Sequence, residues 1–330
     1  MPDASPTDEN QDHRSTTAMR SVSAVVVSYF TGPLLGRAIA SLKRQPEIDE
    51  IILVDNGNWP GAVDAAVAAS PDGAPVLVIS GHGNVGFATA CNLGAKRANA
   101  EFLLFLNPDA EAPAGAVAGL MAAADTVPSP FLIGPKLLDP DGSEQQGGRR
   151  EVLTPWSAFV EITKLHRLAP NHPSFRRFNL HEEPCPGSLC ETPTISGACF
   201  FLRREDYFSI GGMDERYFLH VEDVDFCLRF KRAGGQVYYN PLVAIPHNKS
   251  SSRVSAIRVE RRKTTSMILY FKTHFQRAYP PGFLFVLNGL LWSAFGVKAM
   301  RRLLFRVRPS LLFGSTASRA RRINRRHKER

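Results

Sequence analysis

Short apolar runs alternate with amphipathic stretches along the first half of the chain. The runs are rich in Val, Ile, Leu and Phe, have the length of buried strands, and cover residues 24–28, 51–55, 76–80, 102–107 and 131–135. Segments with apolar residues at helical spacing lie between them and cover residues 34–44, 62–69, 87–98 and 114–124. This order favours an α/β fold with a mostly parallel sheet flanked by helices on both faces. Because ligands of such sheets bind at the carboxyl ends of the strands, the polar residues just after each strand matter most.

The second half of the chain has a different pattern. Residues 138–193 are rich in Pro, Gly and charge, which predicts loops and short helices. Further along, the pattern predicts a strand over 195–202, a short helix, a helix over 222–233 that ends at two glycines, two strands near 237–239 and 242–245, and a long helix over 255–279.

Residues 283–297 form an apolar stretch that ends directly before Lys298, Arg301 and Arg302. This stretch is shorter than the roughly 20 apolar residues that a membrane-spanning helix needs. The pattern therefore favours a helix that lies in a membrane interface, with its basic residues among lipid phosphates. A helix of the protein core or of a dimer interface is the alternative.

The positive charge is concentrated at the C-terminal end. The net charge of the chain is +9, and residues 298–330 alone hold twelve Lys or Arg and one acid, so the rest of the chain is close to neutral. A neutral body with a basic tail indicates that the tail contacts an anionic surface, either lipid headgroups or nucleic acid. A solubilising tail without a partner is the alternative.

Two observations bear on the compartment. The first twenty residues are polar and lack the apolar core of a signal peptide, so we interpret them as a disordered leader. The cysteines are few, odd in number and scattered, which is typical of reduced thiols. They are Cys91, Cys185, Cys190, Cys199 and Cys227. Both observations predict a cytoplasmic location for the globular part.

A glycine-rich loop follows the third predicted strand. Gly81-His82-Gly83-Asn84-Val85-Gly86 matches the G-x-G-x-x-G pattern of dinucleotide-binding loops and opens a helix. The loop follows the third strand instead of the first, and the chain offers no hydride-transfer site, so a NAD-dependent dehydrogenase is the weaker interpretation. The same glycines suit any loop whose backbone closely approaches a phosphate or a strand.

Two clusters of polar and acidic residues have the composition of a reactive site. Asn107-Pro108-Asp109 places a carboxylate directly after a buried strand, where it could hold a divalent cation, although this tripeptide is also an ordinary turn. Glu222-Asp223-Val224-Asp225 begins a helix. Acids at that position cap a helix and offset its dipole, but three in four residues exceed that need. Clustered acids raise the proton affinity of one another, which suits a general base.

Taken in order, the motifs of residues 23–252 resemble one family. They are Val25-Val26-Val27-Ser28-Tyr29, Val54-Asp55-Asn56-Gly57, Asn84-Val85-Gly86-Phe87 with Asn92 and Gly94, Leu106-Asn107-Pro108-Asp109, Gly134-Pro135 with Asp139-Pro140-Asp141-Gly142, Ser196-Gly197-Ala198, and Gly211-Gly212-Met213-Asp214-Glu215-Arg216-Tyr217-Phe218 before the acidic cluster. Most are weak alone, but their order and spacing are specific. The chain resembles the family-2 glycosyltransferases and, within them, the rhamnosyltransferases of cell-wall and O-antigen synthesis. The resemblance implies a GT-A fold with a C-terminal helical extension, and sugar transfer from a nucleotide diphosphate donor to a hydroxyl group.

The resemblance assigns the donor nucleotide to the first strand ends. Asp55 would hydrogen-bond the pyrimidine base, and Ser28 would lie beside the nucleotide. Asn56, Asn84 and Gly86 would complete this part of the site.

The resemblance also implies a divalent metal, Mg²⁺ or Mn²⁺. Asp109 occupies the second acidic position of the D-x-D motif of the family and would bind the metal and the diphosphate. Asn107 stands at the first acidic position, as in the rhamnosyltransferase branch, and leaves the site with one charge fewer. His247 would help to hold the metal or the diphosphate.

Asp223 would be the base that deprotonates the acceptor hydroxyl, with Glu222 beside it and Asp225 in support. Gly197 would lie near the acceptor. Related sequences also contact sugar or acceptor through a loop that here contains Gln145, Gln146, Arg149 and Arg150.

The implied reaction is a single inverting displacement, with dTDP-L-rhamnose preferred among pyrimidine-nucleotide sugars. A glycan acceptor linked to a polyprenol would explain the apolar helix and the basic tail, with the protein peripheral at the inner face of the plasma membrane and nucleic acid disfavoured. A non-catalytic protein that binds sugar nucleotides or glycans is the alternative, and the presence of the acids argues against it.

The sequence predicts four parts of the chain. They are a leader (1–20), a GT-A domain (21–253) with a nucleotide-binding half (21–137) and an acceptor-side half (138–253), a helical extension (254–312) and a basic tail (313–330).

Overall fold

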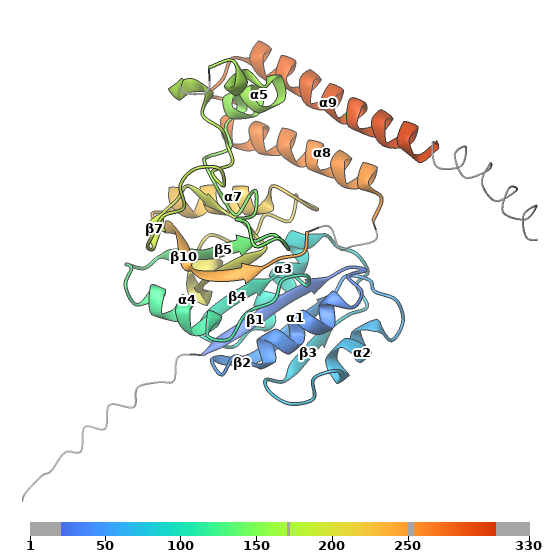
Figure 1. The fold of residues 1–330 in the computed structure, drawn as a ribbon, viewed down its shortest axis with the longest axis vertical. Coiled ribbons are helices and arrows are strands. Elements are labelled where there is room, and N and C mark those ends of the chain that lie inside the picture. Colours follow the sequence, from blue (N-terminus) through green and yellow to red (C-terminus); the bar gives the residue numbers. More distant parts are fainter. Residues whose placement is uncertain (1–20, 170–171, 250–253, 308–330) are drawn as a thin grey trace, which may run out of the picture.

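An eight-stranded sheet forms the centre of the protein (Figure 1). The computed structural model describes residues 21–169, 172–249 and 254–307, so the predicted leader and basic tail lie outside the described residues. The strand order is β3-β2-β1-β4-β9-β5-β10-β7. The strands are β1 (Val22–Ser28), β2 (Ile48–Asp55), β3 (Val76–Ile79), β4 (Phe102–Leu106), β5 (Phe131–Leu138), β7 (Cys190–Glu191), β9 (Cys199–Arg203) and β10 (Gln236–Pro246).

The sheet is mixed but mostly parallel. Strands β3, β2, β1 and β4 are parallel neighbours, and β5 is parallel to β10. Strand β9 runs antiparallel between β4 and β5, and the short β7 pairs antiparallel with β10. All seven residues of β1 are buried, as expected for a central strand covered on both faces.

Two details of the sheet differ from the sequence prediction. The strand predicted over 195–202 is interrupted at residues 196–198, and its first part is β8 (Thr194–Ile195), which pairs with β6 (Arg149–Arg150). The two strands predicted near 237–239 and 242–245 are one strand, β10, whose register shifts between Asn240 and Ala244. A bulge of this kind bends a strand without ending it.

Helices cover both faces of the sheet. Apolar residues of α1, α2 and α4 share one buried cluster with the strands, and residues of α3 and α7 share the cluster on the other face. A third cluster joins α5, α7, α8 and α9. The helices are α1 (Leu34–Lys43), α2 (Ala62–Ala68), α3 (Phe87–Arg97), α4 (Ala116–Ala124), α5 (Pro155–Thr163), α6 (Arg204–Ser209), α7 (Glu222–Arg232), α8 (Ala256–Phe275) and α9 (Pro281–Val307), with short 3-10 turns at Leu165–Arg167 and Pro173–Phe175.

Two motif residues on α3 serve packing. A Cβ on Gly94 would lie 2.4 Å from Val25 Cγ1, so only glycine lets α3 approach β1 this closely. Asn92 Nδ2 donates hydrogen bonds to Met213 O and to Glu215 Oε1, each with a length of 2.9 Å. These contacts fasten α3 to the segment that precedes α7.

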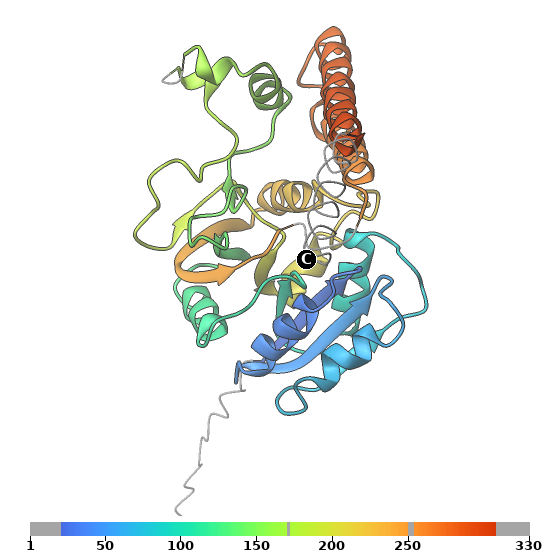
Figure 2. The same cartoon turned by 45° about the vertical axis from the view of Figure 1, so that its right-hand side comes forward.

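Helices α8 and α9 stand together at one end of the molecule (Figure 2). The sequence prediction that the apolar segment is too short to span a membrane is wrong on length, because the helix continues beyond residues 283–297 at both ends. By length and composition alone, Pro281–Leu304 could cross a membrane, and 11% of its most apolar window is buried. Large exposed apolar residues of α9 are Phe285, Val286, Trp292, Val297, Met300, Leu303 and Leu304.

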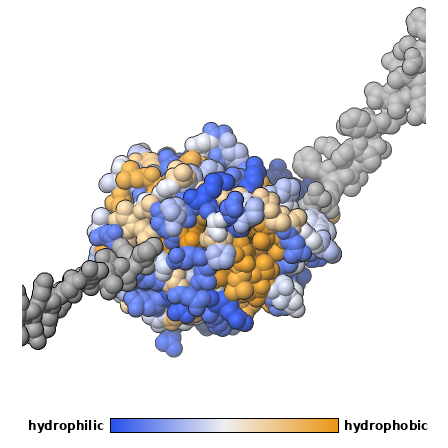
Figure 3. All heavy atoms as spheres, turned by 90° about the horizontal axis from the view of Figure 1, so that it is seen from below, coloured by the Kyte–Doolittle hydropathy of each residue, from blue (hydrophilic) through white to orange (hydrophobic). Residues whose placement is uncertain are grey.

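The opposite end of the molecule is mostly hydrophilic, with separate apolar areas (Figure 3). All five cysteines of the chain are free thiols in the structure, as the sequence predicted.

Candidate active site

The carboxyl ends of β1 and β2 bring Ser28 and Asp55 together. The buried Ser28 hydroxyl lies 3.1 Å from Thr31 Oγ1 and donates to Asn58 Oδ1 over 3.2 Å. The Asp55 carboxylate accepts hydrogen bonds from Asn58 Nδ2 (2.7 Å) and from the backbone N–H of Gly57 (2.9 Å). Asn58 thus bridges the two residues predicted to lie beside the nucleotide. The sequence prediction did not include Asn58, although a polar residue just after the end of a strand is a candidate for such a site.

The glycine-rich loop is held by contacts within the protein. Asn56 Nδ2 donates to Gly86 O over 3.0 Å, and His82 Nε2 lies 3.2 Å from Asn56 Oδ1. The backbone N–H of Gly86 donates to Asn84 Oδ1 over 3.1 Å. The structure therefore brings Asn56, Asn84 and Gly86 together. Because the N–H of Gly86 is already paired, however, this donor is not available to a phosphate.

Gly86 passes very close to the loop before α7. A Cβ on Gly86 would lie 2.7 Å from Phe218 O, and its φ of 91° is one that side chains rarely adopt. We expect Gly86→Ala to displace Phe218 and to lower the free energy of unfolding by about 2–4 kcal/mol, because backbone strain and overpacking add. Urea unfolding of the purified chain measures this loss.

Gly81→Ala is the matched control for this substitution. Gly81 has nearly the same φ, 90°, but nothing lies within 4 Å of the position that its Cβ would occupy. Its substitution therefore measures backbone strain alone, and we expect a loss of about 1–2 kcal/mol. Equal losses for the two variants would show that the close contact with Phe218 does not affect the free energy of unfolding.

The ends of β4 and β10 bring Asn107, Asp109 and His247 together. His247 Nε2 lies 3.1 Å from Asp109 Oδ1 and 3.2 Å from Asn107 Nδ2. The backbone N–H of Asn248 donates to Asp109 O over 2.9 Å, which fixes the two strand ends relative to each other. Asp109 and His247 are both buried. The structure therefore brings His247 next to Asn107 and Asp109, which are far from it in the sequence.

Gln145 orients the His247 ring. Gln145 Nε2 donates to Asp139 Oδ1 (2.6 Å) and to His247 O (3.0 Å), so Gln145 Oε1 is left to accept from His247 Nδ1, 2.6 Å away. With the hydrogen on Nδ1, the lone pair of Nε2 is directed toward Asp109. Gln145 is thus buried behind the histidine and does not form part of an acceptor surface, contrary to the sequence prediction.

A carboxylate oxygen next to an imidazole nitrogen fits a divalent cation. Ligating histidines typically donate their second N–H to a neighbouring acceptor, as His247 does to Gln145. Among the residues that the structure describes, no group of three or more His, Cys, Asp or Glu could hold a metal. Asp109 and His247 would therefore supply a minority of the ligands, and water and phosphate oxygens would supply the rest.

The carboxylate of Asp223 lies at the start of α7 and is held from three sides. Its Oδ2 accepts hydrogen bonds from Arg150 (2.6 Å) and from the backbone N–H of Gly197 (3.1 Å), and its Oδ1 accepts from the N–H of Val224 (2.8 Å). Burial alone would raise the pKa of Asp223, but the Arg150 guanidinium and these hydrogen bonds hold it below its ordinary value of 3.8. Asp223 is therefore ionised at neutral pH.

Residues 196–198 connect Asp223 to the Asp109 cluster. Gly197 donates to Asp223, and the carbonyl of the next residue, Ala198, accepts from the N–H of Asn107 over 2.9 Å. A Cβ on Gly197 would lie 3.0 Å from Asp223 Cβ, so the segment needs glycine at this point. The break in the predicted strand thus brings the two acidic clusters next to each other.

Glu222 is a buried acid without a full set of partners. Among the described residues, none forms a hydrogen bond with Glu222 Oε2. Burial, and secondly the charge of Asp223, raise the pKa of Glu222 to about 8. The two neighbouring acids thus differ in protonation at pH 7, with Asp223 charged and Glu222 neutral.

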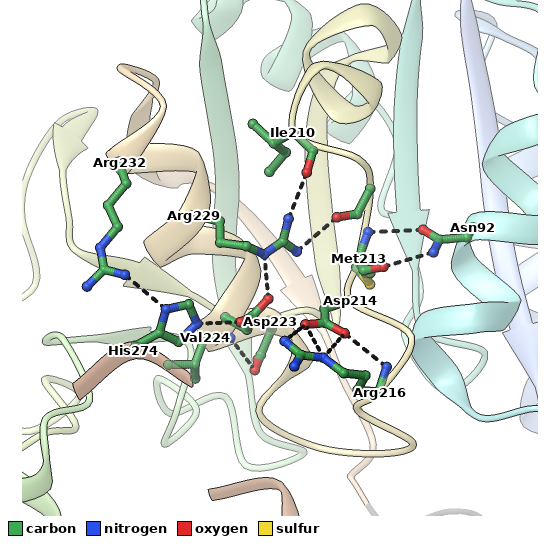
Figure 4. A network of polar contacts seen from close by, with 12 residues as sticks. Asn92, Ile210, Met213, Asp214, Arg216, Asp223, Val224, Arg229, Arg232 and His274 are labelled. Carbon is green, nitrogen blue, oxygen red and sulfur yellow. Dashed lines mark hydrogen bonds and ion pairs between the residues drawn. The ribbon is translucent and has the colours of Figure 1, made fainter. Parts of the chain in front are cut away.

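Asp225 links α7 to α8 through Arg229 and His274, two side chains of the polar network in Figure 4. Its Oδ2 accepts from Arg229 Nε (2.7 Å), and its Oδ1 lies 2.6 Å from His274 Nε2. His274 Nδ1 in turn lies 2.9 Å from the Arg232 guanidinium. Asp225 therefore supports the position of α7.

Arg149 and Arg150 diverge because neighbouring residues of a strand point to opposite faces. Arg150 reaches Asp223, whereas Arg149 pairs with Glu144 (2.6 Å) and lies over the Tyr239 ring. Arg149 is buried in these contacts, so the structure places only Arg150 beside Asp223.

Known proteins resemble this chain in sequence. Residues 23–207 match the family described as Glycosyl transferase family 2. The N-acetylglucosaminyl-diphospho-decaprenol L-rhamnosyltransferase of Mycobacterium tuberculosis is 31% identical over 250 residues, which cover 69% of this chain and 76% of that protein. The chain belongs to glycosyltransferase family 2. The dehydrogenase interpretation of the glycine-rich loop is therefore wrong.

Solved structures show that this family-2 glycosyltransferase has the GT-A fold. GalNAc-T7 with UDP, GalNAc and Mn²⁺ superposes with a TM-score of 0.54 at 17% identity, over 83% of this chain and 54% of that one. The mannosyltransferase PcManGT of Pyrobaculum calidifontis, in complex with GDP-Man and Mn²⁺, superposes with a TM-score of 0.52 at 16% identity, over 89% of this chain and 81% of that one. At these identities the likeness concerns the fold alone.

Proposed function

We propose that this glycosyltransferase is an inverting rhamnosyltransferase that uses dTDP-L-rhamnose and a lipid-linked glycan acceptor. The observation that carries the proposal is the ionised Asp223 carboxylate, joined through residues 196–198 to the Asp109 and His247 cluster. The choice of rhamnose rests on the 31% identity to the mycobacterial rhamnosyltransferase.

In the proposed reaction Asp223 accepts the proton of the acceptor hydroxyl. The hydroxyl oxygen forms a bond to the anomeric carbon of the donor while the bond from that carbon to the diphosphate breaks, which inverts the configuration. Asp109 and His247 would hold Mg²⁺ or Mn²⁺, and a bound divalent ion supplies positive charge for the departing diphosphate. Ser28, Asp55 and the residues around them would bind the nucleotide.

Arg150 and Gly197 fix the Asp223 carboxylate in this proposal. Their hydrogen bonds to Oδ2 keep the carboxylate oriented and charged before the acceptor arrives. The neutral Glu222 beside it avoids a second negative charge at the same site.

The acceptor side of the proposal involves the C-terminal helices. The exposed apolar side of α9 and the basic residues near its end favour peripheral contact with an anionic membrane over contact with nucleic acid. The mycobacterial relative is named for an acceptor with a diphospho-decaprenol carrier. We therefore infer that this protein works at the inner face of the plasma membrane on a polyprenol-linked glycan.

A donor screen tests the proposal. Purified full-length protein is incubated with a GlcNAc-diphospho-lipid acceptor, Mn²⁺ and either dTDP-L-rhamnose, UDP-glucose or UDP-galactofuranose, and the products are analysed by mass spectrometry. We expect addition of one deoxyhexose with dTDP-L-rhamnose and none with the UDP-sugars. Transfer of a different sugar would contradict the donor assignment, and an absence of transfer from all three would contradict the proposal as stated.

A further inference from the structure

Arginine side chains surround an open cavity between α8 and the loop that precedes α7. The cavity has a volume of about 400 Å³. Its lining residues are Arg216, Phe218, Arg258, Arg261, Arg262, Thr265, Ser266 and Leu269. Phe218 also lies against Gly86 of the glycine-rich loop, and all the lining residues follow residue 207, where the family match ends.

The positive charge of this cavity is largely uncompensated. Arg216 pairs with Asp214 over 2.6 Å. Arg258, Arg261 and Arg262 form no ion pair with any carboxylate in the part of the chain that the structure describes. Burial, and secondly the charge of Arg258, lower the pKa of Arg262, so these two guanidinium groups repel each other. A bound anion would remove this repulsion.

The geometry of the cavity suits a phosphate group attached to an apolar chain. The Arg262 guanidinium lies 3.5 Å from the centre of the Phe218 ring, which holds it at the cavity wall. Guanidinium groups bind phosphate oxygens through paired N–H donors, and several of them together match a diphosphate better than a single charge. Phe218 and Leu269 add apolar surface beside these donors.

Helix α8, which supplies most of the cavity lining, contacts both the loop before α7 and the apolar helix α9. Ser266 of α8 donates to Leu219 O over 3.2 Å, in the loop that leads directly into Glu222 and Asp223. On α8, Glu260 forms an ion pair with Lys298 of α9 over 3.0 Å. A group bound in the cavity is thus connected through α8 both to α7 and to the proposed membrane contact.

We propose that the arginine-lined cavity binds the diphosphate of the lipid-linked acceptor, which rests on the function proposed above. The diphosphate of the donor is assigned to Asp109 and His247 at the strand ends, on a different set of elements. The cavity is built entirely from the C-terminal part of the chain, mostly from α8, which packs against the helix whose exposed apolar side would meet the lipid of the acceptor.

Binding of farnesyl diphosphate to the full-length protein tests this proposal. The assay is isothermal titration calorimetry in EDTA, so that no divalent ion can bridge the ligand to Asp109. We expect the double variant Arg258→Gln/Arg261→Gln to weaken binding by roughly tenfold or more, because each arginine contributes a charge-assisted hydrogen bond. The double variant Lys272→Gln/Arg277→Gln, which removes the same charge from the other end of the α8 region, should bind as the unmodified protein does.

Three outcomes would overturn the proposal. Equal binding by both double variants would remove the cavity from acceptor recognition. If farnesol bound as tightly as farnesyl diphosphate does, the cavity would not recognise the phosphate groups. A parallel loss of dTDP affinity in Arg258→Gln/Arg261→Gln would assign the cavity to the donor. Because the assay contains no donor and no turnover, its result does not depend on whether the chain transfers rhamnose.

Discussion

Replacing Asp223 with asparagine is expected to lower the rate of sugar transfer by two to four orders of magnitude, the range that general bases contribute (~10²–10⁴). The amide keeps the shape of the side chain but cannot accept the proton of the acceptor hydroxyl. Because Asp223 has no described contact with the nucleotide residues, dTDP affinity should stay within about twofold. Initial rates with a radiolabelled donor and equilibrium binding of dTDP measure the two effects separately.

Glu222→Gln is the matched comparison for this substitution. It makes the same exchange one residue earlier, but burial raises the pKa of Glu222 to about 8, so the amide replaces a carboxyl group that is already neutral at pH 7. We expect its loss of rate at pH 7 to be about tenfold or less. If Glu222→Gln abolished transfer and Asp223→Asn retained it, the roles of the two acids would have to be exchanged.

Removing the Asp109 carboxylate is expected to have the second largest effect. Asp109→Asn deletes the charge that faces His247 Nε2 over 3.1 Å, and with it the strongest ligand that the site offers a divalent ion. We expect the rate to fall by about a hundredfold or more, since a bound ion contributes several kcal/mol at the leaving group. EDTA should produce a similar loss in the unmodified protein, and excess Mn²⁺ should restore that rate.

Glu111→Gln serves as the control for the Asp109 substitution. Glu111 lies two residues further along the chain, and its side chain forms an ion pair with the exposed Arg37 side chain at 3.3 Å. Its removal should leave both the rate and the Mn²⁺ dependence unchanged. Full activity of the unmodified protein in EDTA would contradict the metal assignment for Asp109 and His247.

Much of the fold could be predicted because the signals were local. The buried strands and the helices between them follow from apolar periodicity, and the family motifs mark the ends of β1, β2 and β4. The prediction failed where a tertiary contact overrides the local pattern. The sequence predicts a strand through residues 196–198, but the strand is interrupted there, and the backbone N–H of Gly197 donates to Asp223 instead. Residues 237–245 read as two strands, yet β10 continues through a bulge.

The site was predictable in its acids but not in their partners. Asp109 and Asp223 follow from position and motif. Arg150 and Gln145, by contrast, contact residues that lie 73 and 102 positions away in the sequence. Sequence reasoning also could not choose between Arg149 and Arg150, since only the pairing of β6 decides which side chain faces Asp223.

The contact between Asp225 and His274 has a geometric consequence. It joins the helix that carries Asp223 to α8, and ion pairs of Glu260 with Lys298 and Arg302 join α8 to α9. These contacts tie α7, α8 and α9 to one another. With α9 resting on a membrane, as proposed above, this linkage sets the height of Asp223 above that surface, and so determines how long a headgroup and its glycan must be for the terminal hydroxyl to reach it.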